Sequence, residues 1–467
     1  MKKFNVVLLG LMLVMGKAVY AEDLLAIYQQ ALEADPELKS SEAKIGIGTA
    51  QKGQALGAML PQVTGTANWS INSQRQGKKN SFVSDYYGVR YIVSLNQTLL
   101  DFSKFWTWRR TKATESQYTL ENIEAQHTLL FKVVEKYFDV LATEDELDFY
   151  KSEEEITEQQ LEQIQKLFDR QLIKITDLYA IEAHLDQVKA SIIEAETKVV
   201  TAKGSLKELT NTSPAMLLKL RGDIDYKELE GKLEDWLEVA KSENPTIAAK
   251  QYAIAAADHE VTAQKSKHLP VVDLQLNYFN TNTGFQSASL SGGTVETQVA
   301  AINVNVPIFS GGTTTKQTQE AQHRLTLNKY DKEATLRELI KETSDSFLTS
   351  NASVRRIKAT RKALESASKS REAMETGFGY GVETISDVLN AQKEEFRVMQ
   401  DLAKAKYSYI KNRMRFMQAI GMISEENLAE LNGWLQGASA QVEKEPIHSK
   451  AQPVSGVHPP KYLSKAH

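Results

Sequence analysis

The sequence predicts an exported membrane protein of mixed α and β structure, built as a tandem structural repeat. Three observations lead to this fold class: an apolar leader, a repeat with an offset near 209 residues, and alternating strand pairs followed by very long helices. The composition has 25% charged and 42% hydrophobic residues and a mean hydropathy of −0.38, which excludes a polytopic helical membrane protein. It still allows membrane strands, because these are only half apolar.

Charge, cysteine content and motifs exclude several classes of protein. The chain has 56 basic and 60 acidic residues and a formal charge of −4, so it lacks the basic field that nucleic-acid binding requires. It has no cysteine, which excludes disulfides, thiol catalysis and a lipidated N-terminal cysteine. Neither a nucleotide-binding loop, a GxSxG motif nor a metal-like histidine spacing occurs. We therefore expect no enzyme, no metal and no cofactor.

Residues 1–21 are typical of a cleavable signal peptide. Two lysines precede an apolar run over 6–15, and Val19 and Ala21 occupy positions −3 and −1 of a cleavage site before Glu22. The apolar run is too short for a membrane-spanning helix of about 20 residues. We expect an exported mature chain without a transmembrane helix.

The mature chain repeats itself at a nearly constant offset of 207 to 210 positions. The recurring pairs are Asp35-Pro36 with Asn244-Pro245, Leu60-Pro61 with Leu269-Pro270, Phe102 with Phe309, Phe138 with Phe347, and Thr176-Asp177 with Ser386-Asp387. A constant offset through loops, strands and helices indicates a tandem duplication. We assign a first structural repeat to 22–228 and a second to 229–435. The tail at 436–467 lacks periodicity and is expected to be disordered.

Each repeat is expected to open with a helix, at about 40–59 and 245–268, and to continue as two strands joined by a polar loop. The loops are assigned to 72–85 and 280–297. Apolar residues alternate with polar ones along all four strands, as a sheet with one apolar and one wet face requires. The apolar positions include Val63, Trp69 and Ile71, then Tyr91, Val93 and Leu95, then Leu274 and Leu276, and finally Ile302 and Val304.

About 65 residues with almost no glycine or proline follow each strand pair. A continuous helix of that length is roughly 100 Å long. Hairpin tips are expected near 169–175 and 377–383, with return helices that end near 210 and 420. The narrow apolar stripe of these helices favours coiled-coil packing with neighbours. An ordinary soluble coiled-coil rod is the alternative interpretation of the helices alone.

Four strands per chain cannot close a barrel, because the smallest closed membrane barrels need about eight. A symmetric oligomer that shares one barrel resolves this problem. Aromatic residues stand where a membrane-interface girdle would need them. These residues are Tyr86 and Tyr87 at one end of the strands and Trp106 and Trp108 at the other. The alternative for the second pair is the start of an amphipathic helix packed on a neighbour.

Four segments in order make the chain resemble the TolC family of outer-membrane efflux and secretion channels. They are Leu60-Pro61-Gln62, Leu95 to Phe102, Ile302 to Gly312, and Thr384 to Ala391. The resemblance implies a homotrimer in the cell outer membrane with one 12-stranded β-barrel, four strands per chain, continued by a long periplasmic α-helical coiled-coil barrel. It also implies a passive exit duct of a tripartite efflux pump or type I secretion system. A scaffold or adaptor without a pore, in the periplasm, is the alternative.

The resemblance further implies partners and a gate at the helical tip. The partners are outer-membrane lipid, a periplasmic adaptor, and an inner-membrane transporter of the ABC or RND type. The constriction or gate positions are Thr176, Asp177, Phe378, Glu383, Asp387 and Asn390, and the adaptor contacts are Leu172, Ile173, Lys174, Gly381 and Val382. A ring of three Asp387 carboxylates would favour cations in a narrow aqueous throat.

The gate departs from the family pattern at several positions. Glu383 stands where the family has an arginine, Phe378 where it has a tyrosine, and Asn390 where it has a second aspartate. The usual bridge from an arginine to Asp177 is therefore absent, and we expect a different or weaker lock. The first tip has Gln171 in place of the family's glycine.

A local structural role is the alternative for the polar residues at both tips. Thr176 and Ser386 would be helix N-caps, with Asp177 and Asp387 in the first turn, where a negative charge complements the helix dipole.

Overall fold

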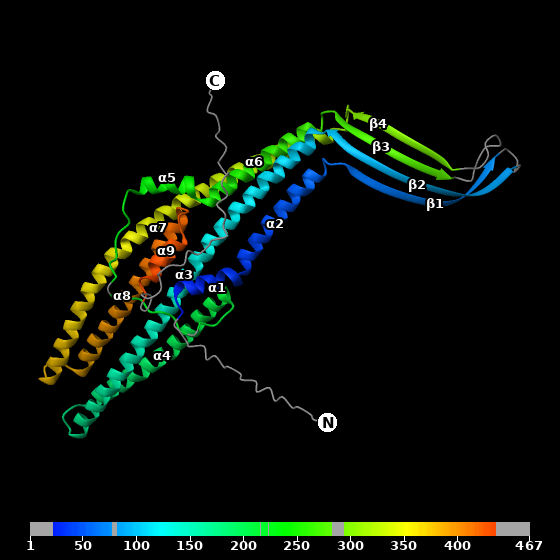
Figure 1. The fold of residues 1–467 in the computed structure, drawn as a ribbon. Coiled ribbons are helices and arrows are strands. Elements are labelled where there is room, and N and C mark those ends of the chain that lie inside the picture. The colour runs from blue at the N-terminus through cyan, green and yellow to red at the C-terminus, as the bar shows by residue number, and fades with distance from the viewer. Residues whose placement is uncertain (1–21, 77–81, 215, 223, 283–293, 436–467) are drawn as a thin grey trace, which may run out of the picture.

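The computed structural model describes residues 22–76, 82–214, 216–222, 224–282 and 294–435. The predicted signal peptide and the predicted tail lie outside these residues, so both stay predictions. The described chain forms a long rod of helices that continues at one end into a curved sheet (Figure 1). None of the described helices is both long and apolar enough to cross a membrane.

The same order of elements occurs twice along the chain. The first half contains α1 (Leu24–Ala34), α2 (Pro36–Gly57), β1 (Gln62–Gln76), β2 (Phe82–Leu100), α3 (Phe102–Asp169) and α4 (Ile175–Thr210). The second half contains α5 (Leu233–Glu243), α6 (Pro245–Ser266), β3 (Val271–Asn282), β4 (Val295–Asn305), α7 (Thr313–Gly379), α8 (Ile385–Ala419) and α9 (Glu425–Asn432). The expected pairs of long and return helices are therefore confirmed.

The prediction of a loop at 72–85 is wrong over most of this range. Strand β1 continues to Gln76 and β2 begins at Phe82, and Asn72 and Ser73 pair with Tyr86 and Asp85. The polar side chains that suggested a loop do not prevent pairing, because backbone N–H and C=O groups make the ladder.

Equivalent caps start the two helices that lead into the strands. The Asp35 side chain accepts a hydrogen bond from the Leu38 N–H at 2.7 Å, and the Asn244 side chain accepts one from the Thr246 N–H at 2.9 Å. A proline at the first helical position follows each cap. These caps explain why α2 starts at Pro36, four residues before the start that we predicted.

The four strands form one antiparallel sheet in the order β1-β2-β3-β4. Its register pairs Val63 with Leu95, Leu95 with Leu276, and Leu276 with Ala300. Directly paired residues point to the same side of a sheet, so the apolar faces of all four strands combine into one. Among the described residues, the outer edges of β1 and β4 pair with no other strand.

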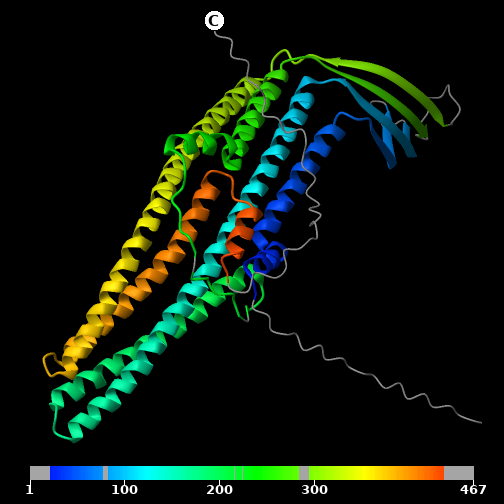
Figure 2. The ribbon, with the colours of Figure 1, turned by 60° about the vertical axis from the view of Figure 1, so that its left-hand side comes forward.

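The helical rod continues the sheet. Helices α2, α3, α6 and α7 pack side by side in the order of the strands to which they connect. At the far end of the rod lie the tips of two hairpins, α3 with α4 and α7 with α8 (Figures 1 and 2). The rod thus separates the sheet from both hairpin tips by the length of its longest helices, 68 and 67 residues.

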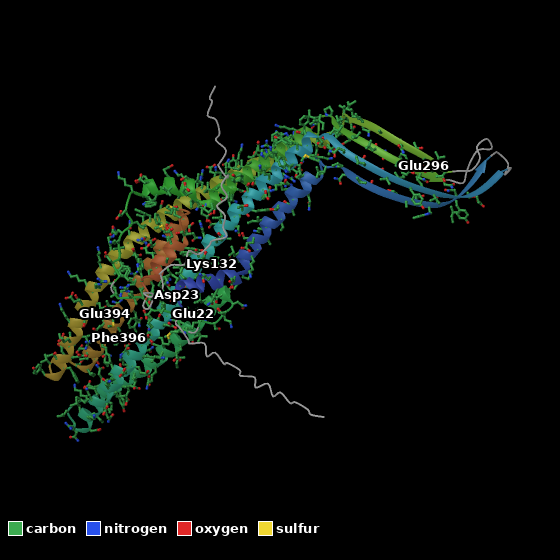
Figure 3. The ribbon with its side chains drawn as sticks, viewed as in Figure 1. Glu22, Asp23, Lys132, Glu296, Glu394 and Phe396 are labelled. Atoms are coloured by element: carbon green, nitrogen blue, oxygen red, sulfur yellow. The ribbon has the colours of Figure 1, made fainter. Side chains whose placement is uncertain are left out.

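The main core lies midway along the rod, where α1, α3, α8, α9 and the 217–226 segment meet. Tyr137 is fully buried there, and its hydroxyl donates to the backbone oxygens of Glu22 at 3.2 Å and Leu218 at 3.0 Å. Figure 3 labels Glu22 beside this core and Phe396 further along α8 toward the tip. The core anchors the chain segments that lie outside the long hairpins.

Gly421 provides a test of this packing. Its φ is +74°, and a Cβ atom built there would lie 2.8 Å from the Asn244 Cα and 2.9 Å from the Glu243 oxygen. We expect Gly421→Ala to destabilise the protein by about 2–4 kcal/mol, because backbone strain and overpacking add. The measurement is thermal unfolding of the detergent-solubilised protein.

The matched control is Gly204→Ala in the last two turns of α4, where the new Cβ meets no atom within 4 Å. It is expected to leave stability unchanged or to raise it by about 0.5–1 kcal/mol. Equal melting temperatures for the two variants would contradict the role assigned to Gly421.

Candidate functional site

One face of the sheet presents large apolar side chains to the surroundings. Trp69 is 68% exposed, Ile71 80% and Ile302 67%. The ring of Trp69 meets that of Tyr91 edge-on at 6.1 Å between centroids, across β1 and β2. A continuous apolar face of this extent marks a contact surface for lipid or protein. The prediction of a sheet with one apolar face is therefore confirmed.

The predicted girdle residues lie at opposite ends of β2. Tyr86 and Tyr87 pair with Asn72 and Ile71 in the outer half of the β1–β2 ladder, and Tyr87 is 75% exposed. Trp106 and Trp108 lie in the first turns of α3, just after β2 ends. Trp106 packs on the His259 ring of α6 at 5.3 Å, so this residue has the helix-packing role that was the alternative.

The two hairpin tips use the same backbone conformation with different residues. Gln171 has a φ of +61° in the first tip, and Gly381 has a φ of +72° in the second. A left-handed conformation costs a residue with a side chain roughly 1–2 kcal/mol and costs glycine nothing. The first tip therefore keeps the turn without the glycine and carries local strain instead.

An apolar cluster, which we call the tip cluster, joins the two hairpins just above the tips. Its buried members are Ile164, Leu178 and Ile181 of the first hairpin and Ile385, Val388 and Leu389 of the second. Phe378, a predicted gate residue, and Ile173, a predicted adaptor contact, pack against it partly buried. These two side chains therefore face the cluster between the hairpins.

The polar residues at the tips cap helices, but not at the predicted cap positions. The N-cap of α8 is Thr384 rather than Ser386, and that of α4 is Lys174 rather than Thr176. Each predicted cap lies two positions too late, because both helices begin earlier than the sequence pattern indicated. Thr176 is exposed and its side chain caps neither helix end.

Asp177 and Asp387 occupy equivalent positions in their helices, in the first turn as predicted. The backbone N–H of Lys174 donates to Asp177 at 3.3 Å, and that of Thr384 donates to Asp387 at 3.0 Å. The Thr384 hydroxyl donates a further hydrogen bond to Asp387 at 2.5 Å. This hydroxyl, together with the backbone bond, holds the pKa of the Asp387 carboxyl below its ordinary value.

Asp387 and Asn390 lie in the first two turns of α8, and Asn390 is exposed, whereas Glu383 lies two residues before the helix begins. The aliphatic part of Glu383 lies over Gly377, where a Cβ atom would come within 2.6 Å of the Glu383 Cγ. Among the described residues of this chain, neither Glu383 nor Asp177 makes an ion pair with Arg170 or Lys174. The structure therefore places a carboxylate row at the tip without an ion-pair lock inside the chain.

Sequence reasoning missed two contacts with buried carboxylates above the tip cluster. Arg371 of α7 contacts Glu395 of α8, which is 8% exposed, and also Glu375 at 2.6 Å. His184 of α4 lies 3.4 Å from Glu153 of α3, which is 5% exposed. The position of Glu395, next to Phe396 on the apolar side of α8, was the available signal. These contacts join the helices within each hairpin.

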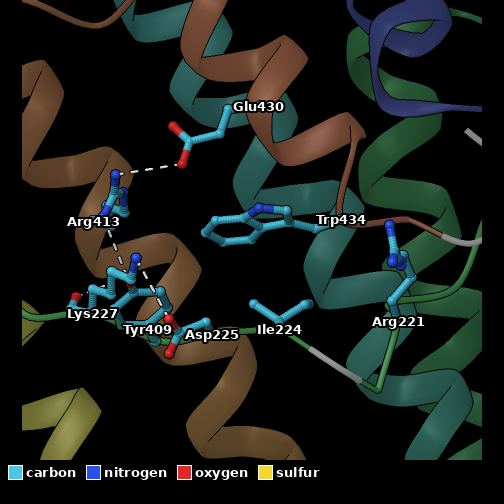
Figure 4. Close-up of a pocket in the computed structure, with 8 residues that line it drawn as sticks. All are labelled: Arg221, Ile224, Asp225, Lys227, Tyr409, Arg413, Glu430 and Trp434. Carbon is cyan, nitrogen blue, oxygen red and sulfur yellow. Dashed lines mark hydrogen bonds and ion pairs between the residues drawn. The ribbon is translucent and has the colours of Figure 1, made fainter. Parts of the chain in front are cut away.

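A cavity of about 330 Å³ lies at mid-length between α8, α9 and the 221–227 segment (Figure 4). Four of its five charged lining residues pair with one another, Arg413 with Glu430 at 3.5 Å and Lys227 with Asp225 at 3.5 Å. The Tyr409 hydroxyl donates to the Lys227 oxygen at 3.0 Å. These contacts give the cavity walls a structural role at mid-length of the rod.

Comparisons with known proteins agree with this geometry. A family model described as outer membrane efflux protein matches residues 27–212 and 236–422. The outer membrane protein TolC of Vibrio cholerae is 30% identical over 430 residues, which are 91% of this chain and 96% of that protein. The alkaline protease secretion protein AprF of Pseudomonas aeruginosa is 26% identical over 427 residues, covering 89% of this chain and 88% of that protein.

Solved structures have the same fold. The CmeC outer membrane channel of Campylobacter jejuni matches with a TM-score of 0.77 and 17% sequence identity, covering 89% of this chain and 90% of that one. A structure of CusC matches with a TM-score of 0.76 and 16% identity, covering 86% of this chain and 93% of that one.

Proposed function

The chain belongs to the family of outer membrane efflux proteins, and from this premise we propose how its parts divide the work of a channel. It is an outer-membrane channel that serves as the passive exit duct of an efflux pump or type I secretion system. It works as a homotrimer with a periplasmic adaptor and an inner-membrane transporter. Its sheet contributes to the β-barrel and its rod to the helical conduit in the periplasm.

The observation that carries this function is the sheet with one apolar face and two unpaired edges. In water, such a sheet would expose both its apolar side chains and its edge N–H and C=O groups. In a membrane, the apolar face meets lipid, and the edges of β1 and β4 pair with neighbouring copies of the chain. A periplasmic scaffold without a pore has no use for this surface.

Planar bilayer recordings of the purified protein test the function directly. We expect a heat-modifiable trimer from the outer-membrane fraction to form discrete pores, because the wet face of the closed sheet lines an aqueous passage. A soluble periplasmic monomer without channel activity would overturn the proposal.

The lock of the resting tip is the tip cluster rather than an ion pair. All six of its core side chains are at most 7% exposed, and they come from both hairpins. Truncation of one such side chain typically removes about 2–5 kcal/mol. Exposed ion pairs contribute about 0–1 kcal/mol. The apolar contacts can therefore hold the hairpins together although Glu383 replaces the family's arginine.

Asp387 supplies the charge of the throat. Three copies of its carboxylate, one from each chain, form a ring that favours cations. Asn390 lies one turn further along α8 and Glu383 lies just before the helix, so they extend this ring by one polar and one acidic layer. Asp177 and Thr176 border it from the first hairpin, where the two tips meet across the cluster.

The two tip loops form the adaptor contact. Leu172 is 67% exposed and Val382 78%, beside the charged Lys174 and the turn residue Gly381. Tyr380 is 83% exposed and extends this surface, although the sequence did not single it out. Exposed apolar side chains on rigid hairpin ends suit a partner that covers them. Ile173 faces the tip cluster and supports this surface from inside.

Ile181→Ala tests the apolar lock. Ile181 is fully buried in the tip cluster, so its truncation is expected to weaken the lock by about 2–4 kcal/mol and to raise the opening frequency roughly tenfold or more. Single-channel recording gives this frequency. Ile193→Ala, on the same helix at a 66% exposed position away from the tip, is the matched control and should leave opening unchanged. Unaltered gating in Ile181→Ala would contradict the lock.

Thr384→Val tests the charge of the throat. The substitution removes the hydroxyl that bonds Asp387 and keeps the shape of the side chain, so the pKa of Asp387 is expected to rise. A depressed pKa keeps the carboxylate charged as pH falls. Cation preference, measured as reversal potential in a salt gradient, should therefore be lost at a higher pH in the variant than in the natural protein. Asp387→Asn should abolish the pH dependence, and identical curves for all three proteins would refute the assignment.

A further inference from the structure

The first turns of α3 hold two cations against aromatic rings on one face of the helix. The Arg109 guanidinium lies 5.5 Å from the centre of the Phe105 ring, and the Lys112 ammonium lies 5.9 Å from that of Trp108. The rings of Phe105 and Trp108 are themselves 6.1 Å apart. Residues spaced by three and four positions share a helix face, so these four form one surface, which we call the α3 aromatic–cation surface.

The charge of this surface is not balanced within the chain. Two neighbouring cations have carboxylate partners: Arg110 pairs with Glu260 at 2.7 Å, and Lys52 pairs with Glu115 at 2.5 Å. In the part of the chain that the structure describes, Arg109 and Lys112 make no ion pair, and both are exposed. Two cations that lie against rings and have no ion-pair partner match an anionic ligand.

The position of the surface identifies the kind of ligand. Helix α3 begins two residues after β2 ends, and the Lys104 ammonium donates to the Thr98 hydroxyl of β2 at 2.6 Å. From Phe105 to Lys112 the helix rises about 10 Å. The headgroup layer on each side of a bilayer is about 5–8 Å thick. When the apolar face of the sheet lies in the hydrocarbon, this surface lies in or next to the headgroup layer on the helical side.

The second repeat lacks such a surface. Residues 313–324, the first turns of α7, contain no phenylalanine, tyrosine or tryptophan, and Arg324 pairs with Glu320 at 2.7 Å. The surface is therefore not a general requirement of the strand-to-helix junction. It is specific to the first repeat and occurs once per chain.

We propose that the α3 aromatic–cation surface binds the headgroup of an anionic phospholipid, one per chain, on the periplasmic side of the outer membrane. The Arg109 guanidinium and the Lys112 ammonium bind the phosphate and any further headgroup charge. Phe105 and Trp108 contact the glycerol and the upper acyl region. The proposal rests on the function above, since it requires the sheet to lie in the membrane.

Native mass spectrometry of the detergent-solubilised trimer tests the proposal, with phosphatidylglycerol and phosphatidylcholine as probes. We expect up to three phosphatidylglycerol molecules to be retained per trimer in preference to phosphatidylcholine. Arg109→Gln with Lys112→Gln should weaken phosphatidylglycerol binding roughly tenfold or more and leave phosphatidylcholine binding unchanged. Inorganic phosphate in excess should not displace the lipid, because the rings contribute through its apolar part.

Arg355→Gln with Lys358→Gln is the matched control. These residues are also exposed, have the same types and spacing, and lie in α7 about 63 Å from its start. The control should bind both lipids like the natural protein. Phe105→Leu with Trp108→Leu keeps both charges and is expected to lose part of the affinity.

Three outcomes would overturn the proposal. They are equal retention of the two lipids by the natural protein, unchanged retention in the Arg109 and Lys112 variant, and dissociation of that variant into monomers. The last outcome would assign the cations to a contact between chains. Failure of the function itself is a different result, because the natural protein would then form neither trimers nor pores.

Discussion

The unpaired edges of a four-stranded sheet are the constraint on which the rest of the structure depends. Strands β1 and β4 have N–H and C=O groups along one side with no partner in the described chain, and the sheet is apolar on one face only. Lipid can cover the face, but only other strands can satisfy the edges. The chain therefore needs copies of itself. Because α2, α3, α6 and α7 keep the order of the strands, closing the sheet also closes the helical wall.

The closed wall needs a place where it can open, and the long hairpins provide one far from the membrane. The main core holds α1, α9 and the middle of α3 and α8 together, so movement there would disturb many buried side chains. The tip cluster is much smaller and is separated from that core. Local stability follows the amount of buried apolar contact. The hairpin ends can therefore separate while the middle of the rod stays intact.

The fold could be predicted from the sequence because the order of helices and strands is repeated and each element has a strong periodicity. Details that depend on single contacts could not be predicted. Alternation along Val63 to Ile71 predicted the apolar face, but polar residues such as Asn72 hid the extension of the strands. Pairing by backbone atoms leaves no signal in side-chain type. The caps Lys174 and Thr384 and the burial of Glu395 depend on where helices begin and pack. Of the site, Glu383 and Asp387 were named from the resemblance to the family, while the tip cluster required the packing of four helices.

Differences between the two repeats indicate which positions have a function in one repeat only. Where both repeats do the same work they keep the same solution, as in the Asp35 and Asn244 caps before a proline. They differ at the tips, where Thr384 adds a hydroxyl bond to Asp387 while Lys174 offers Asp177 only its backbone N–H. They differ again at the membrane end. The first turns of α3 hold cations without ion-pair partners against aromatic rings, and the first turns of α7 have no such combination. Under the proposals above, one copy per chain suffices to bind a lipid headgroup and to set the charge of the throat, and the other copy is then under no such constraint.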